Sequence, residues 1–390
     1  MKTHRRFWLG WALALAALTA VAAWGISQWN LSRYTQAVSD RLVLLGELRR
    51  GALQQYLDTA SAELRFWSTS PGLLAMHQRL VQEWIVDDDT GHARELRRLY
   101  IHDNPHPLGQ RADLLQATDA TYCVLHAQMH EMARQFVTER GYYDFFLIGV
   151  DGYIEYTVEK EDDFATNLVD GPYSETGLAE VFHAAVETPG KVAISDLERY
   201  SPSNQAPALF MATALQQPSG EITGVVAFQL PTGRFLDIMS YTSGMGETGE
   251  TYLVGEDRLM RSNSRFIEGS TVLEQTVNSD TVALALAGEE GVQFTLDYRD
   301  VEVLSAFTAV AVGEHRWALM AEIDREEAVS GAAGERPPLA GILALFYGLS
   351  LWSVWYWRGR ELPDPSSEVA SMSPDAVLGA GDDGGGMGGA

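Results

Sequence analysis

The sequence has a single cysteine, Cys123, among 390 residues. One cysteine excludes any disulfide within the chain, so packing and hydrogen bonds must hold the fold together. Basic residues are also scarce, since 28 Lys and Arg stand against 53 Asp and Glu and give a net charge of −25. A protein of that charge repels phosphate backbones, which makes nucleic acid a poor partner.

Sequence motifs of catalysis and metal binding are missing as well. No Gly-x-Ser-x-Gly motif occurs, and Cys123 has no histidine paired with it by local spacing. His126 and His130 lie four residues apart on a predicted helix, but a third metal ligand is not evident, so we expect solvated or capped histidines. The run 160–163, KEDD, lacks the glycine-punctuated spacing of a calcium loop and predicts a solvated loop. We therefore expect no catalytic residue, no metal and no cofactor, and no enzyme activity.

Three glycines, Gly244, Gly246 and Gly249, have the spacing of a dinucleotide-binding fingerprint. That fingerprint needs a strand before the glycines and a helix after them, because the helix N-terminus binds the phosphates. Here a helix is predicted over 231–241 and a strand over 251–254, which is the reverse order. The glycines therefore predict a flexible turn between a helix and a strand.

Two apolar runs, 7–26 and 339–357, are each long enough to cross a bilayer, which takes about 20 residues. Basic residues lie on the outer side of both runs, at 1–6 and just after 357. The positive-inside rule then places both termini in the cytoplasm and the intervening residues outside it. We expect a two-span protein of the bacterial inner membrane, with an extracytoplasmic sensor domain and a disordered cytoplasmic tail at 358–390.

The segment 27–140 is predicted to be helical. Apolar residues follow the spacing of one helix face from Leu31 to about Trp67, which predicts a long helix continuous with the first apolar run. Further helical patterns occupy Leu73 to about Tyr100 and Thr121 to about Glu139. The long helix carries an apolar stripe that is able to pair with another helix.

After residue 140 the spacing of apolar residues changes from the 3.6-residue period of a helix to the 2-residue period of a strand. The stretch with this strand pattern occurs twice. FLIGVDGYIEY at 146–156 aligns with YLVGEDRLMRS at 252–262, and each copy precedes a helix, further strands and a final helix. The dipeptide Asp151-Gly152 predicts a tight hairpin turn. These features predict an α+β protein with two mostly antiparallel units, at 141–240 and 241–330.

This layout resembles the double-Cache sensor domain of bacterial chemoreceptors and membrane sensor kinases. The residues that carry the resemblance are 141–168, 171–182, 200–213, 246–266 and 316–328. The resemblance implies a membrane-distal PAS-like unit at 141–240 and a membrane-proximal one at 241–330. It also implies a small-molecule ligand, usually bound in the distal unit, and a homodimer.

The chain departs from that family in two ways. No linker domain or signalling coil follows 357, so any signal has to pass to a separate effector protein. The amino-acid-binding members carry an Arg-x-Trp-type pattern near the pocket, whereas 197–204 reads LERYSPSN, so an amino-acid ligand is not supported.

Aromatic and polar residues of the distal unit are the candidates for ligand binding. Asp196 would suit a cationic group, and Arg199 would suit a carboxylate. The alternative is that the tyrosines are half-buried core residues and that Arg199 and Asp196 form a surface pair. The full candidate set is Tyr156, Tyr173, Asp196, Arg199, Tyr200, Ser203 and Phe210.

The function expected from these features is a membrane-anchored sensor that binds a small solute and signals through a partner, as in chemotaxis. A membrane-tethered binding or scaffold protein without signalling output is the alternative.

Overall fold

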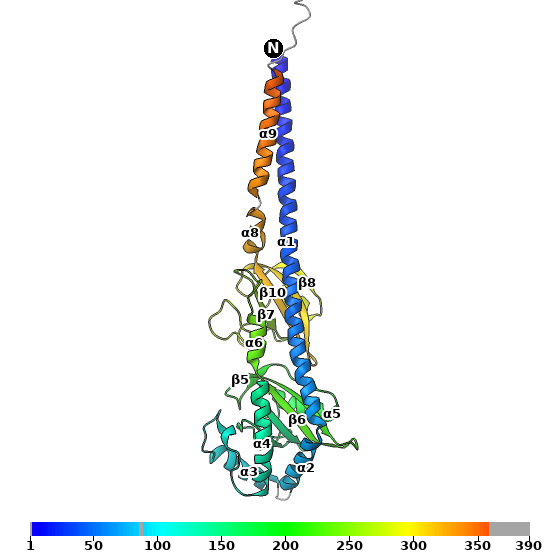
Figure 1. Cartoon of the computed structure of the whole chain (residues 1–390), viewed down its shortest axis with the longest axis vertical. Helices are drawn as coiled ribbons and strands as arrows, with labels where there is room; N and C mark the ends of the chain where they lie inside the picture. Colours follow the sequence, from blue (N-terminus) through cyan, green and yellow to red (C-terminus); the bar gives the residue numbers. More distant parts are fainter. Residues whose placement is uncertain (1, 86–88, 335, 359–390) are drawn as a thin grey trace, which may run out of the picture. The chain divides into compact units, whose positions relative to one another are not determined.

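The computed structural model describes residues 2–85, 89–334 and 336–358 (Figure 1). The chain separates into two compact units, which we call the terminal unit and the main unit. The main unit is Arg33–Ser330, and the terminal unit combines the described residues of Met1–Ser32 with those from Gly331 onward.

Two helices, α1 and α8, belong to both units. Helix α1 is continuous over 67 residues. The helices and helical turns are α1 (Lys2–Ser68), α2 (Pro71–Ile85), α3 (Asp89–Arg97), η1 (Arg98–His102), η2 (Arg111–Asp113), α4 (Thr121–Arg140), α5 (Gly177–Glu187), α6 (Thr232–Ser240), α7 (Asp280–Leu286), α8 (Arg325–Gly334) and α9 (Arg336–Arg358).

The terminal unit contains the start of α1 together with α9. Within the described ranges, no helix is both long enough and apolar enough to cross a membrane. The two spans expected at 7–26 and 339–357 are therefore not supported by the structure. The tail expected at 358–390 lies, apart from Arg358, outside the described residues.

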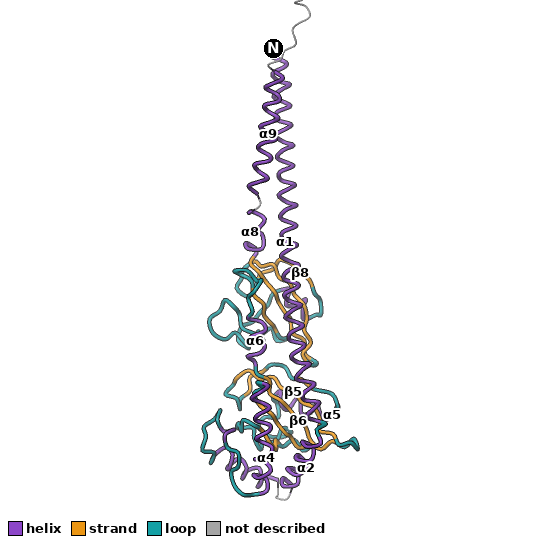
Figure 2. Tube along the Cα trace, in the orientation of Figure 1, coloured by secondary structure: helices purple, strands orange, loops and turns teal. Residues whose placement is uncertain are grey.

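The main unit contains two antiparallel sheets (Figure 2). The first sheet has the order β2-β1-β6-β5-β3, with β4 also paired to β5, and the second has the order β7-β10-β9-β8. We call the sheets and their connections the first lobe and the second lobe. The strands are β1 (Asp144–Gly149), β2 (Ile154–Thr157), β3 (Ala193–Ile194), β4 (Glu198–Tyr200), β5 (Ala206–Gln216), β6 (Ile222–Leu230), β7 (Glu250–Val254), β8 (Gly291–Leu296), β9 (Glu302–Val312) and β10 (His315–Asp324).

Helix α1 packs on one face of each sheet. In the first lobe its residues Leu57 and Leu64 join a core with Phe145 and Phe228. In the second lobe Leu42 joins a smaller core with strand residues of β9 and β10. Because side chains alternate along a strand, the opposite face of each sheet is free for a second layer, which α5 supplies in the first lobe and α7 in the second.

The expected class, α+β with a long N-terminal helix and antiparallel sheets, is confirmed. Both sheets nevertheless fall within one compact unit, so the domain boundary expected at 240/241 stays a prediction.

The three fingerprint-like glycines lie between α6 and β7, in the helix–glycine–strand order that the sequence predicts. Gly244 and Gly246 have φ of 82° and 77°, a left-handed conformation that glycine adopts without strain. A Cβ at Gly249 would lie 1.9 Å from the carbonyl oxygen of Met245, so this position requires glycine for close packing.

Candidate ligand-binding site

A polar row crosses the α5-facing side of the first sheet. Asp144 at the start of β1 pairs with Gln229 of β6, and Gln229 pairs in turn with Phe210 of β5. Alternation places Asp144 on the same face as Phe146 and Ile148, which belong to the apolar core under α5. The row therefore brings a carboxyl, an amide and an aromatic ring side by side at the edge of that core.

The loop that follows β2 supplies further carboxyl groups to this face. Tyr200 donates a hydrogen bond from its hydroxyl to Oδ2 of Asp163 at 2.6 Å. Ser203 donates to Glu161 and accepts from Nε2 of Gln229 at 3.2 Å. These contacts join the loop to β4, β6 and the turn after β4, so residues far apart in sequence form one buried polar cluster.

Three acceptor oxygens of this cluster have no partner. Among the described residues, Oδ2 of Asp144, Oδ1 of Asp163 and Oε1 of Gln229 are buried and accept no hydrogen bond. Asp144 and Asp163 are both 0 % exposed. Burying an acceptor without a donor costs about 1–3 kcal/mol, so three of them in one cluster are unusual for a purely structural core.

Burial also shifts the proton equilibria of the cluster. It raises the pKa of Asp163 to about 7, with Glu161 adding to the shift. The pKa of Asp144 is raised well above its usual range by burial and then by the neighbouring Glu159, Asp163 and Glu161. Near neutral pH these carboxyl groups are therefore partly neutral, and a cation placed beside them would favour their charged forms.

Lys160 is the basic residue inside this loop, and its charge is favoured by Asp144, Glu159 and Asp163. Its Nζ donates to the carbonyl of Thr157 and lies 4.3 Å from the ring centroid of Tyr156 and 5.3 Å from that of Phe164. Burial lowers the pKa of Lys160 to about 7, which halves its charge near neutral pH. Lys160 therefore compensates the carboxyl groups only in part.

The structure brings some of the seven candidate residues together and separates others. Tyr200, Ser203 and Phe210 belong to the polar cluster, and Tyr173 is half-buried with its ring 6.4 Å from that of Tyr200. Tyr156 lies on the opposite face of the sheet, where its hydroxyl donates to Nδ1 of His130 at 2.7 Å.

Asp196 and Arg199 contact the second lobe rather than each other. Asp196 accepts hydrogen bonds from Arg261, at 2.6 Å to Nη2, and from Nε1 of Trp317 at 2.8 Å. Arg199 forms an exposed ion pair with Glu274. Burial acts to raise the pKa of Asp196, but the hydrogen bond and charge of Arg261 outweigh burial and lower it.

One expectation about polar residues is wrong, and a second is wrong in part. Lys160, Glu161 and Asp163 are buried rather than solvated, because the loop folds back over the sheet and takes hydrogen-bond donors from Tyr200 and Ser203. His126 and His130 are fully buried and not solvated, and each ring is capped by a backbone carbonyl, of Leu115 and Ala112 respectively, which agrees with the other alternative expected for them.

Sequence reasoning also missed Asp144 and Gln229. A charged residue at the first position of an apolar strand, as in DFFLIG, is a local signal that could have singled out Asp144. Nothing local marks Gln229, because its role comes from its register opposite Asp144.

No family model and no curated protein matches this chain. Several solved structures are similar to it. The ligand-binding domain of the Pseudomonas aeruginosa amino acid chemoreceptor PctB in complex with L-Arg is 15% identical, with 75% of this chain and 97% of that chain covered and a TM-score of 0.40. The ligand-binding domain of the Campylobacter jejuni chemoreceptor Tlp3 in complex with 4-methylisoleucine is 10% identical, with 77% and 93% covered and a TM-score of 0.44.

The extracellular domain of the putative histidine kinase vpHK1S-Z8 is 11% identical, with 78% of this chain and 95% of that chain covered and a TM-score of 0.43. These proteins belong to the two classes that the double-Cache resemblance names. Their TM-scores and identities are too low to carry an argument about function, which therefore rests on the geometry of this chain.

Proposed function

We propose that the chain is a sensor that binds a small cationic solute, of the primary-amine class, on the α5-facing side of its first sheet. The observation that carries the proposal is the set of three buried, unpartnered acceptor oxygens on Asp144, Asp163 and Gln229. A primary ammonium group has three N–H donors and no acceptor, so it matches three such oxygens in number and in charge.

The surroundings support an amine with an apolar body. Tyr200 and Phe210 lie in edge-to-face contact with ring centroids 4.8 Å apart, next to the polar row. Small-molecule sites typically combine apolar walls with a few placed polar groups, and cations are attracted to aromatic faces. Entry of a solute requires the loop 158–168 to shift, because the unpartnered oxygens are enclosed beneath it.

Membrane attachment, signalling and assembly are proposed on the sequence alone. The apolar runs at 7–26 and 339–357 support anchoring in the bacterial inner membrane with the main unit extracytoplasmic, and the resemblance supports a homodimer that signals through a separate effector. Fractionation of cells that express the full chain tests the anchoring, since recovery in the soluble fraction would contradict it.

Binding of amines to the full chain tests the proposed site. Titration calorimetry with a panel of primary amines, and with carboxylates of matched size, should show binding by an amine and none by its carboxylate counterpart. Asp163→Asn, which keeps the acceptor for Tyr200 but removes the charge, should weaken that binding by at least about tenfold. Asp170→Asn, at an exposed position, is the matched control and should bind as the wild type does.

Binding of carboxylates in preference to amines would contradict the proposal. So would an Asp163→Asn variant that keeps wild-type affinity while its circular dichroism is unchanged.

A further inference from the structure

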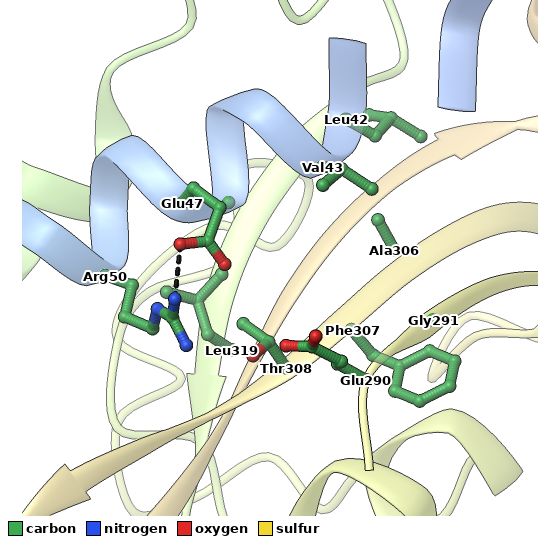
Figure 3. A pocket seen from close by; sticks show the side chains of 11 residues that line it. Leu42, Val43, Glu47, Arg50, Glu290, Gly291, Ala306, Phe307, Thr308 and Leu319 are labelled. Carbon is green, nitrogen blue, oxygen red and sulfur yellow. Dashed lines mark hydrogen bonds and ion pairs between the residues drawn. The ribbon is translucent and has the colours of Figure 1, made fainter. Parts of the chain in front are cut away.

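A separate pocket lies in the second lobe, between α1 and the second sheet (Figure 3). Its volume is about 530 Å³, which is within the usual range of small-molecule sites. Leu42 and Val43 of α1 form one wall, and Thr308 of β9 and Leu319 of β10 form the floor. The pocket is on the α1-facing side of the sheet and belongs to a different lobe from the polar cluster described above.

Small residues keep this pocket open. Gly46 on α1 has no side chain to extend over the sheet, and a Cβ there would already lie 3.5 Å from Leu319. Ala306 fills little of the floor. Larger side chains at these positions would close the space between the helix and the strands.

The polar groups around the pocket leave one negative charge without a partner. Glu47 and Arg50 of α1 form an ion pair on one side, as the dashed line in Figure 3 marks. Glu290 lies on the other side, exposed to solvent, and in the part of the chain that the structure describes it forms no hydrogen bond or ion pair. The Thr308 hydroxyl adds an uncharged donor and acceptor to the floor.

We propose that this pocket binds a second ligand, an amphipathic monocation whose apolar body lies against Leu42, Val43 and Leu319 and whose ammonium group faces Glu290. Apolar burial supplies most of the affinity, and Glu290 selects the sign of the charge. Such a ligand contacts α1 and the sheet together, so it stabilises one packing of the helix against the second lobe.

The experiment measures binding of phenethylamine to the full chain by ligand-observed NMR and titration calorimetry. Phenylacetate is the probe of matched size and opposite charge, and ethylamine is the probe that lacks the ring. Val43→Trp fills the pocket from a partly exposed helix position, and Glu290→Gln removes the charge without changing the shape. Leu44→Trp, on the neighbouring exposed position outside the pocket, is the control.

We expect Val43→Trp to abolish binding of phenethylamine at this site, and Glu290→Gln to weaken it by up to about fivefold, the usual loss for an exposed ion pair. Leu44→Trp should bind normally, and phenylacetate and ethylamine should bind weakly or not at all. The pocket variants are compared in the Asp163→Asn background, in which amine binding to the polar cluster of the first lobe is weakened, so that the remaining binding reports the pocket.

Equal binding of phenylacetate, or binding that survives Val43→Trp in the Asp163→Asn background, would overturn the proposal. Sedimentation supplies another decisive result: if Val43→Trp dissociates a dimer while phenethylamine has no effect, the pocket is an interface between two copies of the chain.

Discussion

Asp163 is one of the residues of the first lobe whose charge changes with pH near neutrality. Its carboxyl group is fully buried, one oxygen accepts from Tyr200, and the other has no partner. A carboxylate in that position loses its hydration, so burial raises its pKa to about 7. Near neutral pH the group is therefore divided between a neutral form and a charged form, and only the charged form attracts a cation.

The first prediction is that amine binding strengthens as pH rises. Between about pH 6 and about pH 8 Asp163 loses its proton, whereas a primary amine with a pKa of about 10 keeps its charge. Affinity measured by titration calorimetry should increase across this range in the wild type and increase less steeply in Asp163→Asn, in which Lys160 still titrates. An affinity that falls with rising pH would mean that the neutral acid is the binding form.

The two sheets carry related polar pairs at the same register. Glu250 of β7 pairs with Glu322 of β10, as Asp144 of β1 pairs with Gln229 of β6. In the pair of the second sheet, however, all four carboxyl oxygens have a hydrogen-bond donor. The two oxygens of Glu322 accept from Ser305 and Tyr252. One oxygen of Glu250 accepts from Tyr298, and the other accepts from the hydroxyl of Ser264 and the backbone N–H of Arg265. Because the carboxyl oxygens of Glu250 and Glu322 already accept hydrogen bonds within the protein, we do not expect an amine to bind there.

The second prediction concerns stability and this carboxyl pair. Burial raises the pKa of Glu322 from 4.5 to about 7, so the free energy of unfolding falls as pH rises from the unfolded value through about 7. Glu322→Gln should remove this loss, making the variant more stable than the wild type above pH 7 by up to about 3 kcal/mol and comparable to it near pH 4.

Urea unfolding at several pH values measures this difference. Glu326→Gln, at an exposed position of α8, should leave the pH dependence unchanged. If Glu322→Gln is destabilised at every pH, its ionised form is more favourable to the fold than burial implies.

The third prediction concerns the buried stripe of α1. Leu64 is 0 % exposed in the core under the first sheet, whereas Phe66, two residues on, is 69% exposed. Leu64→Ala should lower the free energy of unfolding by about 2–5 kcal/mol through the cavity that it leaves. Phe66→Ala should change it by less than about 0.5 kcal/mol. Similar losses in both variants would indicate that Phe66 is covered in solution, for example by a second copy of the chain.

The two lobes are joined through Asp196. It lies next to Ser195, whose hydroxyl accepts from the backbone of Phe210 in the polar row, and it accepts from Arg261 and Trp317 of the second lobe. Arg261 is almost fully buried in this contact. A movement of β5 on ligand binding would therefore reach β10 through a short, bonded path.

The fourth prediction is that this contact couples the lobes. Asp196→Asn weakens the pair with Arg261, so hydrogen exchange in β10 should no longer slow when an amine binds to the first lobe, although the affinity for the amine persists. Arg199→Gln removes an exposed ion pair worth less than about 1 kcal/mol and should preserve the coupling. If an amine still slows hydrogen exchange in β10 of Asp196→Asn as it does in the wild type, the coupling runs through another contact, with α1 as the next candidate.

The sequence by itself determined the elements and much of their order. Apolar spacing marked the long helix, period-2 alternation marked the strands of both sheets, and the glycines between α6 and β7 marked a turn instead of a phosphate site. These features are local, because helix and strand periodicity and the φ angles open to glycine depend on neighbouring residues.

Only the tertiary structure decided which polar residues meet. Asp144 and Gln229 become neighbours through strand register, and Asp196 meets Arg261 rather than the nearby Arg199 because the lobes pack together. The same packing buries Glu161 and Asp163, which look solvated in a charged loop. Burial and pairing depend on which distant segments cover a residue, and that information is set by the global arrangement of the chain and not by its local composition.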